Sequence, residues 1–174
     1  MTITLIGMPG SGKSCMGRAL SKRLGMKTLD GDRLIEETTG RKLQDIINED
    51  GLSGFKELEE KILLSITDDD IIFTPGGSAV YYDSVMQHFK KKGIIIYLYV
   101  SPEVLVERLG DFSRRGIVLK EGQTIRDLYL ERAPLFEKYA DITINCDGDS
   151  YTKYRCIAER KIRTKMKKQN KNAD

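Results

Sequence analysis

The sequence predicts an α/β fold in which helices cover both faces of a five-stranded parallel sheet. Short apolar, β-branched runs recur along the chain, and stretches with apolar residues at helical spacing separate them. In addition, a glycine-rich segment joins the first apolar run directly to the first helical stretch. Alternating strands and helices of this kind form parallel sheets, whose strands are buried on both faces.

Each expected element corresponds to one such run. The expected strands are residues 2–6, 26–29, 71–74, 94–100 and 142–145. The expected helices are residues 13–24, 31–39, 42–49, 55–66, 79–91, 102–109, 124–137 and 150–168. Ligands of open parallel sheets bind beyond the carboxyl ends of the strands, so the residues that follow each strand are the candidates for a functional site.

The composition is that of an ordinary single domain, with 40% hydrophobic and 32% charged residues in a chain of 174. Residues 160–174 contain seven Lys/Arg and one acid, a local charge of +6 within a total of +3, so residues 1–159 carry −3. This basic tail contains no aromatic residue for base stacking, and we expect a solvated helix end and no nucleic-acid partner. The three cysteines show no metal-ligand spacing, and no apolar run is long enough to span a bilayer. We expect no signal peptide, no membrane partner and a cytoplasmic location.

A phosphate-binding segment, residues 7–14 with the sequence GMPGSGKS, lies between the first expected strand and the first expected helix. It matches the pattern Gly-x-x-x-x-Gly-Lys-Ser/Thr at every fixed position, in the strand-loop-helix context that the pattern requires. In such a P-loop, backbone N–H groups and the positive end of the helix bind phosphate. Lys13 is expected to reach the β- and γ-phosphates and Ser14 to bind Mg²⁺. The sequence therefore predicts binding of a nucleoside triphosphate.

Two carboxylates, Asp30 and Asp32, follow the second expected strand. Residues two apart project to the same side of an extended chain, so both are expected to face the cleft. Phosphoryl transfer depends on positioning and charge neutralisation, and two acids beside a triphosphate suit Mg²⁺ and an acceptor hydroxyl. Capping of the next helix by Asp32 is an alternative that is compatible with this role.

Three further features leave alternatives open. Gly76 and Gly77 precede a helix and expose backbone N–H groups to a ligand, although a plain strand-to-helix turn explains them equally well. Lys56 and Glu59 are three residues apart, a spacing typical of an ion pair on an exposed helix. Residues 110–120 contain glycines and a double arginine, which fits either a mobile flap over the phosphates or an exposed loop.

Together these segments resemble the shikimate kinase family, which has the nucleoside-monophosphate-kinase-like P-loop fold. The resemblance runs from residue 2 to about residue 145, and its motifs are the P-loop, LDGD from residue 29, FKxxE from residue 55, TPGG from residue 74 and RAPLF from residue 132. It implies a three-layer fold with sheet order 2-3-1-4-5. It also implies one domain with a core at about 1–158, an acceptor-binding helical region at about 31–62, a lid at about 110–123 and the basic tail at 160–174. A monomer is expected, and a weak dimer stays open.

The resemblance implies MgATP as the phosphoryl donor and assigns residues to it. The implied P-loop contacts are Gly10, Ser11, Gly12, Lys13, Ser14 and Cys15. Ser14 and Asp30 are the implied Mg²⁺ site, and Arg108 lies where an arginine stacks on adenine.

For the acceptor, the resemblance implies a small polyhydroxylated molecule. Asp32 matches the group that orients, or deprotonates, its hydroxyl, and Arg115 matches the lid arginine over the transferring phosphate. The implied catalytic residues are therefore Lys13, Asp32 and Arg115. The implied acceptor-binding residues are Asp32, Lys56, Gly76, Gly77, Ser78 and Arg132.

Three positions depart from the family pattern. Lys56 stands where arginine is usual, and lysine lacks the planar fork that holds a carboxylate through two hydrogen bonds. Ser78 replaces a third glycine, and Gly116 replaces a proline in the lid. Shikimate is the leading acceptor, while another cyclitol or sugar acid, such as an inosose, inositol or gluconate, stays open. A nucleoside-monophosphate kinase fits the acidic pair and TPGG less well, and a nucleotide-binding regulator without catalysis is the alternative from another class.

Overall fold

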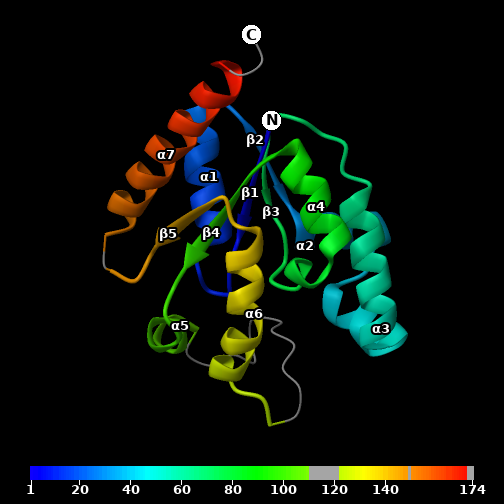
Figure 1. Ribbon diagram of the computed structural model, residues 1–174. Coiled ribbons are helices and arrows are strands. Elements are labelled where there is room, and N and C mark those ends of the chain that lie inside the picture. The colour runs from blue at the N-terminus through cyan, green and yellow to red at the C-terminus, as the bar shows by residue number, and fades with distance from the viewer. Residues whose placement is uncertain (110–121, 149, 172–174) are drawn as a thin grey trace.

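Five parallel strands form one sheet in the order β2-β3-β1-β4-β5 (Figure 1). The computed structural model describes residues 1–109, 122–148 and 150–171. The strands are β1 (Thr2–Ile6), β2 (Lys27–Asp30), β3 (Ile71–Thr74), β4 (Gly93–Tyr99) and β5 (Ile142–Asn145). Their order and parallel direction confirm the predicted fold class.

The helices follow the predicted pattern with one difference. They are α1 (Lys13–Leu24), α2 (Gly31–Thr39), α3 (Leu43–Leu64), α4 (Asp83–Lys92), α5 (Pro102–Leu109), α6 (Ile125–Tyr139), α7 (Tyr151–Lys171) and the short 3-10 helix η1 (Ala79–Tyr81). The two helices expected at 42–49 and 55–66 both lie within α3 and are separated, as predicted, by a break: the backbone leaves the helical conformation at Gly51, where φ is 73° and only glycine avoids strain. The helix expected at 79–91 is divided into η1 and α4.

Side-chain alternation along β3 assigns the helices to the two faces of the sheet. Thr74 points toward α1, where a Cβ atom on Gly17 would lie 3.0 Å from its methyl carbon. Phe73 points the other way and stacks on Phe89 of α4, with ring centroids 4.4 Å apart. Figure 1 shows α1 beside α7, and α4 and α6 over the opposite face. The molecule is therefore a three-layer structure, as the sequence predicts.

The centre of the sheet is fully buried, since Ile3, Leu5 and Ile96 have no exposed surface. All strands run in one direction, so their carboxyl ends meet at one edge. The P-loop, the start of α2 and the segment 75–78 all leave the sheet at this edge. Within the described ranges, none of the helices has the length and apolar character needed to cross a membrane.

Candidate active site

The P-loop curls between β1 and α1 at the carboxyl edge of the sheet. Gly10 and Gly12 have φ values of 80° and 93°, which residues with a side chain rarely adopt. The Lys13 ammonium lies back across the loop and donates hydrogen bonds to the carbonyl oxygens of Gly7, at 2.9 Å, and Met8, at 3.1 Å. Burial lowers the pKa of Lys13 to about 8, although the nearby Asp32 carboxylate favours the charged form. The Lys13 ammonium therefore already lies across the loop, where it can bind a phosphate group.

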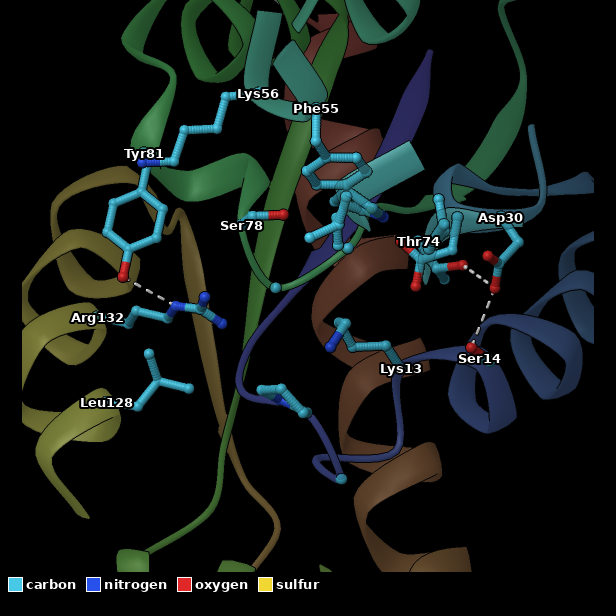
Figure 2. Close-up of a pocket in the computed structure, with 18 of the residues that line it drawn as sticks. Lys13, Ser14, Asp30, Phe55, Lys56, Thr74, Ser78, Tyr81, Leu128 and Arg132 are labelled. Atoms are coloured by element: carbon cyan, nitrogen blue, oxygen red, sulfur yellow. Dashed lines mark hydrogen bonds between the residues drawn. The ribbon is translucent and has the colours of Figure 1, made fainter. Parts of the chain in front are cut away.

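Asp30 joins the P-loop to the start of α2. Its Oδ1 accepts from the backbone N–H of Arg33, at 3.3 Å, and so caps α2. Its Oδ2 accepts from the hydroxyls of Ser14, at 3.1 Å, and Thr74, at 3.3 Å (Figure 2). A carboxylate and two hydroxyls are the hard oxygen donors that suit Mg²⁺ beside substrate phosphates. The donor set therefore fits the ion that the family resemblance implies.

Asp32 lies in the first turn of α2 and opens onto the same cavity. A Cβ atom on Gly76 would come within 2.6 Å of Asp32 Oδ1, so the missing side chain at Gly76 makes room for this carboxylate. Although the side chain is reached from the cavity, protein atoms surround it, and this burial raises the pKa of Asp32. The negative charge of Asp30 raises the pKa further, and Lys13 opposes the shift. A carboxylate with a raised pKa is a stronger base than an ordinary aspartate.

Glu59 is a buried carboxylate, only 1% exposed, that contacts Ser78 of the cavity wall. Its two oxygens accept from the hydroxyls of Ser78 and Tyr82, both at 2.7 Å. Burial raises the pKa of Glu59, and the two hydroxyls partly offset the shift. The prediction of an ion pair between Lys56 and Glu59 is wrong, because the Glu59 side chain is buried while Lys56 is exposed. Among the described residues, the Lys56 ammonium has no hydrogen-bond or ion-pair partner.

Arg132 projects from the middle of α6 and is 8% exposed. Its Nε donates to the Tyr81 hydroxyl at 3.0 Å, and its guanidinium carbon lies 5.1 Å from the centre of the Tyr81 ring. A Cβ atom on Gly77 would come within 2.8 Å of Arg132 Nη1, so this glycine makes room for the guanidinium. Figure 2 shows Arg132 and Tyr81 across the cavity from Asp30 and Ser14, with Lys13 between the two groups.

One cavity of about 630 Å³ joins these groups. The predicted site residues that line it are Gly10, Gly12, Lys13, Ser14, Cys15, Asp30, Asp32, Lys56, Gly76, Gly77, Ser78 and Arg132. Two of the predicted nucleotide contacts lie elsewhere. Ser11 is a buried residue of the P-loop that does not line the cavity, and its backbone N–H donates to the Met8 carbonyl oxygen at 3.1 Å. Arg108 of α5 donates to the Cys146 carbonyl oxygen at 2.6 Å. Arg115 and most of the predicted lid lie outside the described residues.

Comparison with known sequences identifies the family. The family model described as "Shikimate kinase" matches residues 9–166. The chain belongs to the shikimate kinase family. A shikimate kinase from Thermodesulfovibrio yellowstonii is 36% identical over 149 residues, which is 84% of this chain and 86% of that protein. A shikimate kinase from Bacillus anthracis is 38% identical over 120 residues, 69% of this chain and 73% of that protein.

Solved structures agree with this assignment. A shikimate kinase from Acinetobacter baumannii, determined in complex with shikimate, has a TM-score of 0.83 at 29% identity and covers 96% of this chain and 93% of its own. A gluconokinase from Sinorhizobium meliloti, with a TM-score of 0.55 at 18% identity over 99% of this chain and 94% of its own, shares the fold. As a member of the shikimate kinase family, this chain is an ATP-dependent small-molecule kinase with a hydroxyl acceptor, as the sequence predicts.

Several residues of this shikimate kinase-family site do not follow from sequence patterns. Thr74 shares Asp30 with Ser14, Tyr81 holds Arg132, and Tyr82 holds Glu59. A signal for Thr74 exists, because it is a hydroxyl residue at the carboxyl end of a central strand. The two tyrosines have no such signal, since nothing local distinguishes a cavity-lining tyrosine from one in the core.

Proposed function

We propose that this chain transfers the γ-phosphoryl group of ATP to a hydroxyl of shikimate. The observation that supports this most strongly is the single cavity that holds Lys13 and Asp32 beside the P-loop and Arg132 on the opposite wall. Shikimate has ring hydroxyls and a carboxylate, so it suits a site with a base at one end and a guanidinium at the other. The relatives that carry the name shikimate kinase, and the neighbour solved with shikimate, add support.

On the phosphate side, we assign binding of ATP to the P-loop. The backbone of Gly10 and Gly12 and the start of α1, with Cys15 in its first turn, provide N–H donors, and Lys13 provides a positive charge for the β- and γ-phosphates. Ser14 and Asp30 would hold Mg²⁺, which supplies neutralisation of phosphate charge when bound. Arg108 and Arg115 stay assigned to adenine and to the transferring phosphate on the family resemblance alone.

On the acceptor side, Arg132 and Lys56 provide positive charge for the carboxylate. Gly76 leaves space for Asp32, and Gly77 leaves space for Arg132. A side chain at either glycine would collide with the group that it faces. The next residue of the wall, Ser78, donates its hydroxyl proton to Glu59. Its side chain therefore narrows the cavity, but this proton is not available to the acceptor. All these groups come from one chain, so a monomer is sufficient for the reaction.

In the proposed step, the acceptor oxygen attacks the γ-phosphorus while its proton passes to the Asp32 carboxylate. The bond between the γ-phosphorus and the bridging oxygen breaks, and ADP leaves with that oxygen. Because the raised pKa of Asp32 makes it a better proton acceptor, the residue suits this role. Lys13 stays on the phosphates throughout and stabilises their charge.

The test is an ADP-release assay with purified protein, MgATP and single acceptors, namely shikimate, quinate, inositols, inososes and gluconate. We expect turnover with shikimate and the highest kcat/KM for it. If an inosose, an inositol or gluconate is used and shikimate is not, the acceptor assignment is wrong. If no acceptor supports ADP release while ATP still binds in calorimetry, the regulator alternative gains support.

A further inference from the structure

We propose that Tyr81 is a positioning residue that holds Arg132 for the carboxylate of the acceptor. The inference rests on the proposed function, and it adds a residue that the family resemblance does not include. It predicts that acceptor recognition depends on a phenol hydroxyl that need not touch the acceptor itself.

The contact between the two side chains fixes the plane of the guanidinium. Arg132 Nε donates to the Tyr81 hydroxyl at 3.0 Å, and the ring lies against the guanidinium carbon at 5.1 Å. A hydrogen bond and a cation–π contact to one side chain restrict the rotation of the arginine end. The hydrogen bond uses Nε, and no described residue accepts from the two Nη atoms. The Nη pair is therefore available to a carboxylate, a group that guanidinium binds through two parallel hydrogen bonds.

Tyr81 is itself held at both ends. Its hydroxyl donates to Glu131 Oε1 at 2.6 Å, while its backbone N–H donates to the Ser78 carbonyl oxygen at 2.9 Å. Its neighbours Val80 and Tyr82 are buried, so η1 cannot shift without disturbing the core. A hydroxyl that donates to a carboxylate becomes a better acceptor, which strengthens its bond from Arg132. Arg132 therefore rests on a side chain that is fixed before the acceptor binds.

The second cation of the cavity lacks such support. Lys56 is exposed, and the carboxylate three residues along its helix, Glu59, is bonded to Ser78 and Tyr82 instead. A flexible ammonium that must be ordered on binding contributes less than a fixed fork, because ordering its long side chain costs entropy. Recognition of the acceptor carboxylate in this chain therefore depends mainly on Arg132, and through it on Tyr81.

The test compares Tyr81→Phe with the wild-type protein, using shikimate as the acceptor. The variant keeps the ring and loses only the hydroxyl. We expect the KM for shikimate to rise about 10-fold, the order of one hydrogen bond to a charged group, while kcat and the KM for ATP change less than about twofold. The matched control is Tyr139→Phe, because the Tyr139 hydroxyl also donates to a carboxylate, Asp83, yet the residue does not line the cavity. We expect wild-type constants for the control.

A double variant separates positioning from simple packing. Arg132→Lys keeps the charge and loses the Nε donor, so adding Tyr81→Phe to it should change shikimate affinity, measured by calorimetry, less than about twofold. Three results would each overturn the inference. They are a KM for shikimate that is the same in Tyr81→Phe and wild type, a KM for ATP that rises as much as the KM for shikimate, and full additivity of Tyr81→Phe with Arg132→Lys. A wild-type protein that neither binds nor phosphorylates shikimate would instead overturn the proposed function on which the inference rests.

Discussion

The two sides of the cavity are built in different ways. On the phosphate side, Lys13 bonds to backbone oxygens five and six residues away, and the whole P-loop is one uninterrupted segment. On the acceptor side, Arg132 and Tyr81 are 51 residues apart, and Glu59 receives hydroxyls from 19 and 23 residues away. The P-loop is therefore a property of local sequence, although Asp30 and Thr74 reach it from β2 and β3. The acceptor side exists only after α3, η1 and α6 have packed together.

Because of this difference, the two sides of the cavity tolerate different kinds of amino-acid substitution. A motif whose groups bond to its own backbone works in any fold that supplies the strand and the helix. A wall made from three elements can change its residues one at a time, provided that each buried polar group keeps a partner. The departures from the family pattern that the structure describes, Lys56 and Ser78, both lie on the acceptor side.

The largest effect is expected where the two sides meet, at Asp32. Asp32→Asn keeps the shape of the side chain and removes the base, so we expect kcat to fall by about 10²–10⁴ with little change in the KM for ATP. Steady-state kinetics with shikimate and MgATP would measure both constants. Glu37→Gln on the exposed face of α2 is the matched control and should retain wild-type kcat. A near-normal kcat for Asp32→Asn would remove Asp32 from the proton-transfer role.

The next effect concerns stability and tests whether the acceptor wall is one packed unit. Glu59→Ala leaves the Ser78 and Tyr82 hydroxyls without their acceptor, and we expect the free energy of unfolding to fall by about 2–4 kcal/mol. Denaturant titration would measure the loss, and the KM for shikimate should rise while ATP affinity is retained. Glu57→Ala, on the exposed side of the same helix, should be nearly neutral. An unchanged midpoint for Glu59→Ala would show that the two hydroxyls find other partners.

The pKa of Glu59 gives this stability a pH dependence of known sign. Burial raises the pKa of Glu59 in the folded protein above the ordinary glutamate value of about 4.3. Protonation of Glu59 therefore adds to the free energy of unfolding in full below that value, and this stabilisation is lost as the pH rises through the higher pKa of the folded state. Glu59→Gln cannot titrate. Relative to Glu59→Gln, the wild-type protein should therefore lose stability as the pH rises over this window.

The smallest effect tests the phosphate side alone. The pKa of Lys13 is about 8 in the protein without nucleotide, and adjacent phosphates favour the charged form, so binding of ATP should be accompanied by proton uptake. Calorimetry in buffers of different ionisation enthalpy should give about half a proton at pH 8, less at pH 7 and more at pH 9. The control Lys22→Met, an exposed lysine of α1, should show the same uptake. Uptake that does not change between these pH values would contradict the assignment to Lys13.

Much of the fold follows from sequence because its determinants are local. The β-branched runs predict every strand to within one residue, and the P-loop predicts the connection between β1 and α1. The break at Gly51 falls between the two helices expected within α3, as the sequence predicts. The error lies where tertiary packing decides, because the division between η1 and α4 depends on the buried turn around Tyr82.

The site follows the same division. Lys13, Ser14, Asp30 and Asp32 are predictable from their place after strands β1 and β2. Glu59 is not, because a glutamate three residues from a lysine predicts an exposed ion pair, and only the approach of the segment 78–82 provides the two hydroxyls that bond to it. The role of Tyr81 likewise requires knowing that α6 passes η1.

Asp30 has a consequence for how this chain can change during evolution. The carboxylate caps α2 with one oxygen and gathers the Ser14 and Thr74 hydroxyls with the other. Asparagine caps helices about as well as aspartate, but it brings no negative charge to a cation. Given the proposed role of Asp30 in holding Mg²⁺, selection for folding alone would accept asparagine at position 30, whereas selection for phosphoryl transfer would reject it. The residue found at position 30 in a lineage therefore indicates whether selection has maintained phosphoryl transfer, separately from whether it has maintained folding.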